Sequence, residues 1–318
     1  MIDFLVIAGV MVGFFVILAS GLNLQWGLTG LANFGPVGFF ALGAYVTGLV
    51  MVPPPEVSGR TTDSFLFALG WPWPAGLALA LAVTAVAALL LGYALLRTDL
   101  EPLFVAVITL AFAEILFLLL VTQKWLANGF NGIRGIDRPF GQRIGFDDYD
   151  TFFLVVVLAV AAVVFVFVRY VQSSPYGRVL KGIREDPAAV QALGHDIRAF
   201  RLSAFVIGCL IMALAGALWV PFVTVVDPSA FGTEQTFLIW AVLIIGGSGN
   251  AWGPVVGGAL VVGLVQQGTR FLPAGQAFAD LVGPLRGVSI GVLMILFLRF
   301  RPDGMAAESE RRIAPADR

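Results

Sequence analysis

The sequence predicts an all-α fold, a polytopic bundle of membrane-spanning helices with about eight spans. The mean hydropathy of the 318-residue chain is +0.93, and only 12% of its residues are charged, about half the ~25% of an ordinary soluble domain. Its apolar runs are also continuous over about 20 residues, the length that a helix needs to cross a bilayer. A membrane β-barrel would show alternating polar and apolar residues instead.

The predicted spans follow from these runs in order. The first begins at Phe4, and no basic residue precedes it, so we interpret it as a retained span and not as a cleaved signal peptide. The second carries several glycines and Pro36 in its first half and is predicted to be broken. The predicted spans cover residues 4–24, 28–52, 71–96, 102–121, 152–171, 202–226, 237–266 and 281–300.

The seventh of these segments is not expected to cross the membrane as one straight helix. Its first half, Phe237–Ile245, is too short for a layer about 30 Å thick, so the sequence predicts a bent or re-entrant pair that turns around Gly246–Gly249. Two spans and one re-entrant loop both remain open; either has to be buried in protein. The transmembrane domain is expected to cover residues 1–304. A polar tail, 305–318, follows and is expected to be disordered beyond Met305.

Basic residues predict the orientation of the chain. Twelve of the 19 Lys and Arg residues fall on one side of the membrane if the polar block 172–201 and the C-terminal tail are cytoplasmic. An excess of Lys and Arg marks the cytoplasmic side of a membrane protein. The N-terminus is therefore expected outside and the C-terminus inside.

Composition disfavours several classes of function. The net charge of −1 argues against binding of nucleic acid. A single cysteine, Cys209, and a single histidine argue against disulfides and metal clusters, and no metal or other cofactor is expected. The sequence contains no Gly-x-x-x-x-Gly-Lys-Ser/Thr phosphate loop, and no nucleophile–base set stands out. The chain is therefore not expected to be an enzyme or to hydrolyse ATP itself.

The polar block 172–201 holds five basic residues, three acidic residues and the only histidine. Ser173-Ser174-Pro175 predicts the start of one short helix, and Asp186-Pro187 predicts the start of a second with Asp186 as its N-cap. Gly194 is expected to follow the second helix as its C′ residue. That helix would present a small apolar face formed by Ala188, Ala189, Ala192 and Leu193. Either a partner subunit covers this face, or the helix is an ordinary loop helix packed on its own bundle.

Two Gly-Pro interruptions in the spans resemble each other. Asn33-Phe-Gly35-Pro36 is echoed by Asn250-Ala-Trp-Gly253-Pro254. Such breaks in two halves of a chain indicate the midplane pathway of a transporter, although close helix packing also favours glycine. Glu114, the one ionisable residue deep in an apolar span, either lines the pathway or bridges two helices. The candidate pathway residues are Asn23, Asn33, Gly35, Pro36, Glu114, Asn250, Gly253 and Pro254.

The polar block is similar to the cytoplasmic coupling region of ABC importer permeases, whose motif pairs an acidic residue and two alanines with a downstream glycine. Residues 185–189 and Gly194 fill those places. From about residue 20 to 265 the chain resembles the branched-chain amino acid ABC permease family of the LivM type. The matching motifs, in family order, are Gly21-Leu-Asn-Leu24, Gly27-Leu-Thr-Gly30, Gly35-Pro36, Ile108-Thr-Leu-Ala-Phe-Ala-Glu114, Asn128-Gly-Phe-Asn-Gly132, Ser174-Pro-Tyr-Gly-Arg178, Ile245-Gly-Gly-Ser-Gly249 and Gly253-Pro254.

The resemblance implies the permease subunit of an ATP-driven importer in a bacterial cytoplasmic membrane. It implies three kinds of partner: a second permease subunit, either a homologue or another copy, two cytoplasmic ABC ATPase subunits, and a periplasmic or extracellular solute-binding protein. It also implies that the contact with the ATPase is made by Arg184, Glu185, Asp186, Ala188, Ala189 and Gly194.

The chain departs from the family pattern at two places. An Asp-Pro pair is inserted into the coupling motif, and the string Asn128–Arg134 differs from the Gly-rich string common in relatives. Because urea and short-chain amide permeases share the family, the solute stays open between branched-chain amino acids and these amides. The alternative from another class is a stand-alone secondary transporter or channel. The scarcity of ionisable residues within the spans argues against it, because ion-coupled transport uses such residues.

Overall fold

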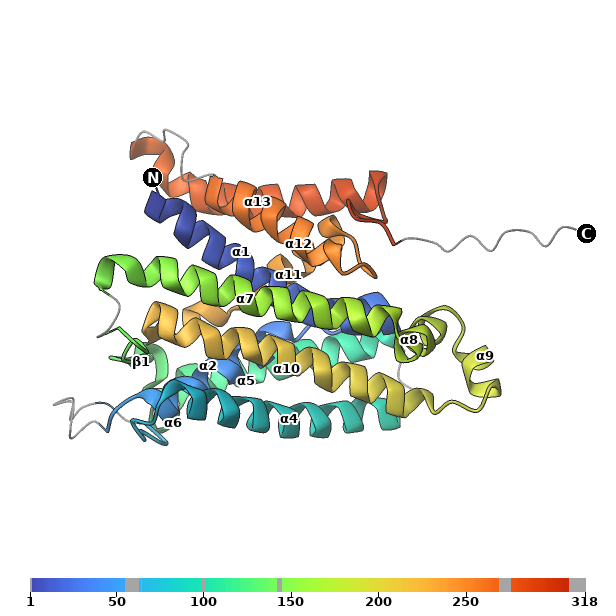
Figure 1. Cartoon of the computed structure of the whole chain (residues 1–318), viewed down its shortest axis with the longest axis horizontal. Helices are drawn as coiled ribbons and strands as arrows, with labels where there is room; N and C mark the ends of the chain where they lie inside the picture. The colour runs from blue at the N-terminus through green and yellow to red at the C-terminus, as the bar shows by residue number, and fades with distance from the viewer. Residues whose placement is uncertain are drawn as a thin grey trace, which may run out of the picture.

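The computed structural model describes residues 2–54, 63, 65–98, 101–141, 145–268 and 276–308. Its long helices run side by side along one axis, and the N-terminus lies at the opposite end of the bundle from helices α8 and α9 (Figure 1). The helices are α1 (Ile2–Leu22), α2 (Pro36–Met51), α4 (Trp73–Arg97), α5 (Pro102–Thr122), α6 (Lys124–Ala127), α7 (Phe146–Ser173), α8 (Pro175–Glu185), α9 (Pro187–Ala192), α10 (Ile197–Val223), α11 (Thr233–Gly246), α12 (Trp252–Gly257) and α13 (Gln276–Phe300).

Shorter elements complete the described chain. Two π-helical segments, η1 (Asn23–Gly27) and η4 (Gly258–Gln267), continue α1 and α12. The 3-10 turns are η2 (Gly129–Asn131) and η3 (Pro228–Phe231). Strands β1 (Ile133–Arg134) and β2 (Val225–Val226) pair antiparallel, so that Ile133 lies opposite Val226. This pair ties the loop after α5 to the loop after α10.

The all-α class of the prediction is confirmed. In the described residues five helices are long and apolar enough to cross a membrane, namely α1 with η1, α4, α5, α7 and α10. Shorter apolar helices are formed by residues 36–51, 233–246, 252–267 and 287–300. The number of eight spans stays a prediction, because three of the eight predicted segments contain only these shorter helices.

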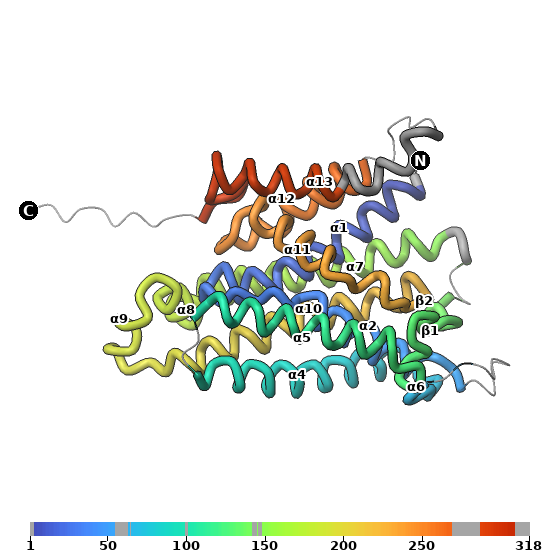
Figure 2. The backbone as a smooth tube through the Cα atoms, turned by 180° about the vertical axis from the view of Figure 1, so that it is seen from behind, coloured from blue at the N-terminus to red at the C-terminus, as the bar shows by residue number. Residues whose placement is uncertain are grey.

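Helices α1 and α10 form the centre of the bundle. In each of them 67% of the most apolar stretch is buried within the chain, against 22–28% in α4, α5 and α7. Helix α10 packs against α1, α2 and α4, and α1 packs against α7 and α10 (Figure 2). The apolar outer faces of α4, α5 and α7 are therefore the surfaces available to lipid or to another subunit.

Glycine allows the two central packing contacts of α10 to be very close. A Cβ atom placed on Gly216 of α10 would lie 2.1 Å from the carbonyl oxygen of Phe40 on α2, and a Cβ on Gly43 of α2 would lie 2.1 Å from the carbonyl oxygen of Ala213. Small residues at such crossings let two backbones touch, which is the main source of helix association inside a membrane.

The predicted break in the second span is confirmed, and its position is more sharply defined. Leu28 and Thr29 still belong to the helix that begins with α1, so the expected start of the second span at residue 28 is wrong. Gly30 then adopts φ +71°, a conformation that glycine tolerates. Residues 30–35 are not helical, and α2 starts at Pro36, its first residue. Proline is well suited to this position because its missing N–H would have no partner there.

The predicted turn around Gly246–Gly249 is also confirmed, since α11 ends at Gly246 and α12 starts at Trp252. With 14 residues, α11 is only about 21 Å long. It begins beside Glu114, eight residues before the end of α5. The start of α11 therefore lies about 12 Å in from that end of α5. The hairpin of α11 and α12 (residues 233–257) reaches the end of the bundle that carries α8.

The C-terminal tail begins later than expected. Backbone N–H groups of Met305 and Ala306 donate hydrogen bonds to the carbonyls of Ile245 and Gly246, over 3.0 and 2.8 Å. The expected disorder beyond Met305 is therefore wrong for residues 306–308. The rest of the tail lies outside the described residues.

Packing between α2 and α10 generates a first prediction. The variant Gly216→Ala should destabilise the folded protein by about 1–3 kcal/mol, because the added methyl group has to push α2 away. Thermal unfolding of the purified protein in detergent measures the effect. Gly291→Ala on α13 is the matched control, since nothing lies within 4 Å of a Cβ there. Equal unfolding temperatures for the two variants would contradict this account of the core.

Candidate functional site

Helices α8 and α9 project from one end of the bundle and follow the long helix α7 (Figure 1). Ser174 caps α8, because its Oγ accepts a hydrogen bond from the N–H of Gly177 at 3.1 Å. Asp186 caps α9 in the same way, because its Oδ1 accepts from the N–H of Ala189 at 3.1 Å. In both helices a proline follows the cap directly. The prediction of two short helices divided at Asp186-Pro187 is confirmed.

The end of α9 is closed by a glycine turn. The N–H of Gly194 donates to the carbonyl of Gln191 at 2.9 Å, and the N–H of His195 donates to the carbonyl of Val190 at 3.4 Å. This is the Schellman pattern, in which the C′ residue adopts a left-handed conformation. Gly194 has φ +86°, so its predicted position as the C′ residue is confirmed. The short helix α9 thus has defined hydrogen bonds at both ends.

The outer surface of α9 is uncovered. Ala188, Ala189 and Ala192 are exposed, and 78% of the surface of Leu193 is accessible. On the inner side Val190 is buried and reaches α8, where a Cβ on Gly182 would lie 2.9 Å from a methyl group of Val190. Helix α9 therefore rests on α8 through one side chain and presents its small residues outward. We call Ala188, Ala189, Ala192 and Leu193 the α9 surface.

The side chain of Arg184 is bound within this chain, whereas it was expected to contact a partner subunit. Its side chain is only 26% exposed. Its Nη1 donates to the carbonyl oxygen of Gly27, and its Nη2 donates to Glu308 Oε2 at 2.9 Å. The guanidinium thus binds two other segments of this chain. The neighbouring acids Glu185 and Asp186 are exposed, as predicted for a surface contact.

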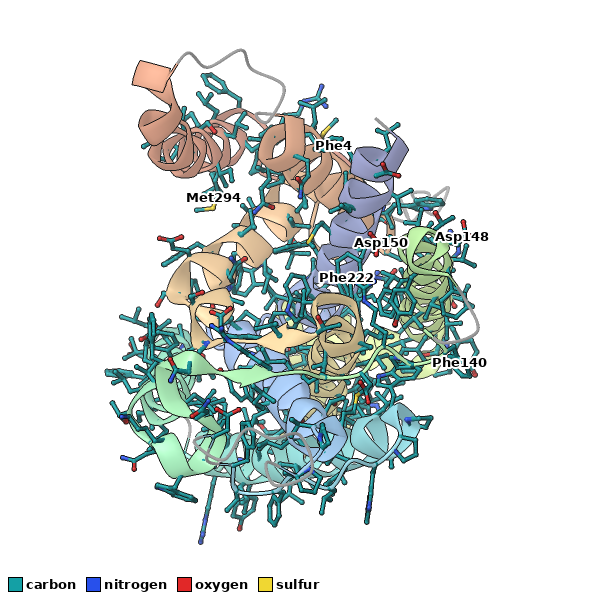
Figure 3. All side chains as sticks on the ribbon, turned by 90° about the vertical axis from the view of Figure 1, so that its left-hand side faces the viewer. Phe4, Phe140, Asp148, Asp150, Phe222 and Met294 are labelled. Carbon is teal, nitrogen blue, oxygen red and sulfur yellow. The ribbon has the colours of Figure 1, made fainter. Side chains whose placement is uncertain are left out.

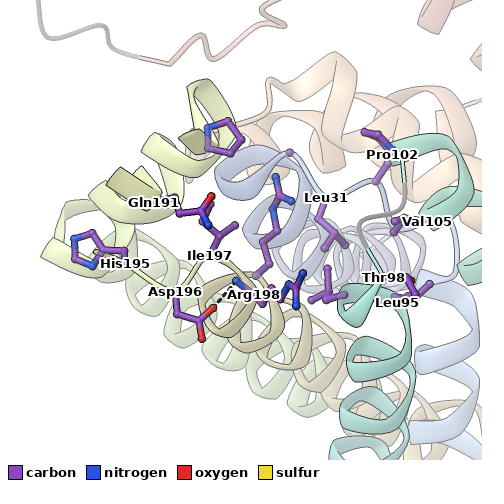
Figure 4. A pocket seen from close by; sticks show the side chains of 15 residues that line it. Leu31, Leu95, Thr98, Pro102, Val105, Gln191, His195, Asp196, Ile197 and Arg198 are labelled. Atoms are coloured by element: carbon purple, nitrogen blue, oxygen red, sulfur yellow. Dashed lines mark hydrogen bonds between the residues drawn. The ribbon is translucent and has the colours of Figure 1, made fainter. Parts of the chain in front are cut away.

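A cavity of about 760 Å³ separates α9 from the bundle. Figure 4 shows Gln191, Arg198 and Ile197 on one side of it, and Leu95, Thr98, Pro102 and Val105 on the other. The wall is completed by residues 30–32, among them the side chain of Leu31, where the helix that starts with α1 has ended. Any displacement of α9 therefore changes the shape of a space that borders the break before α2.

Asn23 and Asn250, two of the predicted pathway residues, lie together at the tip of the hairpin. Asn23 Nδ2 donates to the carbonyl oxygen of Asn250 at 2.9 Å, and its Oδ1 accepts from the N–H of Gly249 at 2.8 Å. Gln172 at the end of α7 binds the same turn, since its Oε1 accepts a hydrogen bond from the N–H of Ala251 at 3.1 Å. Asn23 is fully buried. These amides replace the helical partners that the turn lacks.

Asn33 and Gly35 belong to a second buried cluster at the break before α2. Asn33 Nδ2 donates to Gln25 Oε1 at 2.8 Å, and Trp240 of α11 donates from Nε1 to the carbonyl of Asn33 at 3.1 Å. The N–H of Phe34 donates to Thr109 Oγ1 at 2.9 Å. Thus η1, α5 and α11 all hold the non-helical segment. A Cβ on Gly35 would lie 2.3 Å from the carbonyl oxygen of Thr109, which explains the glycine by close packing.

The two similar Asn-Gly-Pro segments share one local structure. Asn33 Oδ1 accepts from the N–H of Gly35 at 2.8 Å, and Asn250 Oδ1 accepts from the N–H of Trp252 at 3.1 Å. Each asparagine thereby turns the chain two residues ahead, just before a helix begins. Pro36 is the first residue of α2, whereas Pro254 is the third residue of α12. Gly253 is packed so closely that its Cβ would lie 1.8 Å from the carbonyl of Gly247.

Glu114 lies where α11 begins. Thr233, the first residue of α11, donates its hydroxyl to Glu114 Oε1. The carboxyl group is therefore placed at the N-terminal end of a helix, where negative charge is favourable. Of the two roles considered for Glu114, this geometry fits the bridge between two helices.

Gln25, Gln172 and Glu308 are among the residues of these clusters that are absent from the sequence-based candidates. A signal for Gln25 exists, because a glutamine inside an apolar run needs hydrogen-bonding partners. Gln172 lies at the very end of an apolar helix, where polar residues are ordinary. Glu308 belongs to a polar tail, and its partners are more than a hundred residues away in the sequence. No local pattern could identify either one.

Comparison with known proteins places the chain among permeases. The family model described as "Branched-chain amino acid transport system / permease component" matches residues 4–298. The high-affinity branched-chain amino acid transport system permease protein LivM of Escherichia coli is 29% identical over 92% of this chain and 67% of that protein. The probable branched-chain amino acid transport permease protein LivM of Methanocaldococcus jannaschii is 27% identical over 93% of this chain and 91% of the relative.

A differently named permease is also similar. The high-affinity branched-chain amino acid transport system permease protein LivH of Salmonella typhimurium is 24% identical over 93% of this chain and 92% of the relative. No solved structure matches the chain.

The hairpin cluster generates a second prediction. Asn23→Ala should destabilise the protein by about 1–3 kcal/mol, because it leaves buried backbone groups of Gly249 and Asn250 without a partner. Hydrogen exchange of the Gly249 amide should become faster, as measured by exchange and mass spectrometry. Asn131→Ala, at an exposed position in η2, should change neither quantity. An unchanged exchange rate in Asn23→Ala would show that the amide does not hold the turn.

Proposed function

Because the chain belongs to the family of permease components of branched-chain amino acid transport systems, we propose that it is the membrane permease subunit of an ATP-driven importer. Its solute would be a branched-chain amino acid or a related small solute, and separate cytoplasmic ATPase subunits would supply the energy. The α9 surface is the observation that carries the proposal. Apolar surface that faces water and is not covered within the chain is a candidate for contact with another subunit.

The ATPase contact would consist of α9 and the exposed residues around it. Ala188 and Ala189 leave room for the close approach of a partner groove, and Leu193 supplies apolar area for burial. Glu185 and Asp186 bring negative charge to the N-terminal end of α9, where charge of that sign is favourable. Gly194 ends the helix. Arg184 is left out of the direct contact because its guanidinium is bound within the chain.

The transport step would follow from the position of this contact. Closure of an ATPase dimer displaces α9 and α8 as a rigid unit, and a helix bundle responds by changing between two packings. The cavity beneath α9 borders the break at residues 30–35, so a displacement there reaches a segment without helical hydrogen bonds of its own. We assign the lining of the pathway to the neighbourhood of the two broken segments. The residues that would hold these segments in the outward- or inward-facing arrangement are Asn23, Asn33, Gly35, Pro36, Asn250, Gly253 and Pro254.

The remaining partners and the orientation are part of the same proposal. The chain would pair with a second homologous permease, which the similarity to both LivM and LivH proteins supports. It would lie in a bacterial cytoplasmic membrane with α8 and α9 inside. The opposite end, seen in Figure 3, carries Asp148 and Asp150 at the start of α7, whereas Lys181 and Arg184 lie at the α8 end. The proposed orientation depends on the count of Lys and Arg residues, of which 12 of 19 fall on the side that carries α8, α9 and the C-terminus.

A solute-binding protein would dock at that outer end. The paired strands β1 and β2 hold the loop around η2 in place, and Phe130 in this loop is 72% exposed. An exposed aromatic side chain on an ordered loop is a typical anchor of a protein interface. The names of the relatives support branched-chain amino acids as the solute, and the binding protein would make the choice against amides.

The α9 surface generates a third prediction. Ala189→Trp should reduce ATP-dependent uptake at least about tenfold, because a bulky ring on this face prevents the close fit that interface burial needs. Uptake in proteoliposomes and co-purification of the ATPase subunits measure the effect. Ala199→Trp, at an exposed alanine of α10, is the matched control and should retain uptake. Purification of an active carrier without any ATPase would refute the importer and favour a stand-alone transporter.

Glu114 generates a fourth prediction. If its carboxyl group anchors α11, Glu114→Gln should keep uptake within about twofold, because the amide oxygen still accepts the hydrogen bond of Thr233. Glu114→Leu removes the acceptor and should lower thermal stability by about 1–3 kcal/mol. Uptake and thermal unfolding of both variants decide the matter. Loss of uptake in the stable Glu114→Gln variant would place an ionised carboxylate in the pathway instead.

A further inference from the structure

The end of the described chain returns to the hairpin of α11 and α12. Besides the two backbone hydrogen bonds from Met305 and Ala306, Asn250 Nδ2 donates to the carbonyl of Ala307 at 3.1 Å. The approach is close, since a Cβ on Gly304 would lie 2.4 Å from the Cα of Gly247. Gly304 has φ +73°, which turns the chain after α13 back toward the hairpin. We call residues 304–308 the return segment.

The return segment is also bound to α8 by charge. Glu308 accepts from Lys181 Nζ through one oxygen and from Arg184 Nη2 through the other. Burial raises the pKa of the Glu308 carboxyl, but the hydrogen bonds and positive charges of Lys181 and Arg184 outweigh it and hold the pKa below its ordinary value. The carboxylate is therefore ionised at neutral pH. Two cations on one turn of α8 share it.

Arg184 connects a third element to this contact. Its other nitrogen, Nη1, donates to the carbonyl of Gly27, the last residue of η1. A Cβ on Gly249 at the hairpin tip would lie 2.6 Å from Glu308 Oε2 and 3.1 Å from Arg184 Nη1. The side chains of Arg184 and Glu308 thus touch the end of η1, α8 and the hairpin tip at once. These are the ends of both broken segments and the base of the α9 surface.

We propose that the return segment is a mechanical link, in which Glu308, held by Lys181 and Arg184, passes displacements of α8 and α9 to the hairpin tip. The proposal rests on the importer function proposed above. Helix α8 itself packs against α7, α9 and α10. The ion pairs of Lys181 and Arg184 with Glu308 connect it in addition to the return segment, and through that segment to the hairpin. Glu308 is a positioning residue in this account, since it acts through the hairpin and not on the solute.

Charge is suited to a link of this kind. Ion pairs of partly exposed groups can part and re-form at small cost in free energy, whereas a buried apolar contact would hold α8 and the hairpin in one arrangement. Three hydrogen bonds at residues 305–307, two from the backbone and one from the side chain of Asn250, fix the other end of the link to the hairpin. The return segment is therefore held to the hairpin by hydrogen bonds that persist, and to α8 by ion pairs that can part and re-form.

The complete complex, reconstituted in proteoliposomes with its binding protein, tests the proposal through the number of solute molecules imported per ATP hydrolysed. Glu308→Gln should lower this ratio at least about fivefold, the lower end of typical coupling between sites, while ATP hydrolysis persists. Glu308→Asp, which keeps the charge, should recover part of the ratio. Asp303→Asn is the matched control, because Asp303 is an exposed acid of the same region and should keep the ratio of the wild type.

Each outcome decides. An unchanged ratio in Glu308→Gln, or an equal fall in Asp303→Asn, overturns the link. A parallel loss of uptake and ATP hydrolysis would show a merely structural role and also overturns it. If Glu308→Gln fails to assemble, Lys181→Gln is measured by the same criteria. Failure of the wild-type complex to import any solute would instead refute the proposed function, which keeps the two questions separate.

Discussion

The structure depends on one constraint: backbone N–H and C=O groups inside a bilayer need partners within the protein. This chain interrupts its helices twice, at residues 30–35 and at the turn between α11 and α12. Each interruption is held by side-chain amides, the buried Gln25 and Asn33 at the first and the buried Asn23 with the partly buried Gln172 at the second. The central helices α1 and α10 pack tightly because glycine removes side chains from their crossings.

The two interruptions and the α9 surface are linked in space although they are far apart in the sequence. Arg184 of α8 binds the carbonyl at the end of η1, and the tip of the hairpin lies beside it. A force applied at α9 therefore acts where the bundle has the fewest helical hydrogen bonds. In the proposed importer, an ATPase bound at α9 would therefore act on the part of the bundle that can change its packing most easily.

Much of the fold could be predicted from sequence because its signals are local. Apolar runs predicted the long helices, and Ser174, Asp186 and Gly194 indicated the caps of α8 and α9. The similar Asn-Gly-Pro segments were visible too, but their meaning was not: each asparagine turns its own chain. The ordered return segment and the inward position of Arg184 could not be predicted, since both depend on Glu308, whose partners lie more than a hundred residues away.

The exposed Leu193 has a consequence for the stability and abundance of this subunit in a cell. In the proposed importer, a subunit inserted into the membrane without an ATPase would keep an apolar, capped helix in contact with the cytoplasm. Cellular chaperones and proteases continuously remove proteins that are incompletely folded, and uncovered apolar surface is also a liability for aggregation. Covering α9 would therefore serve as a check on assembly, so that the abundance of this subunit follows the supply of its partner.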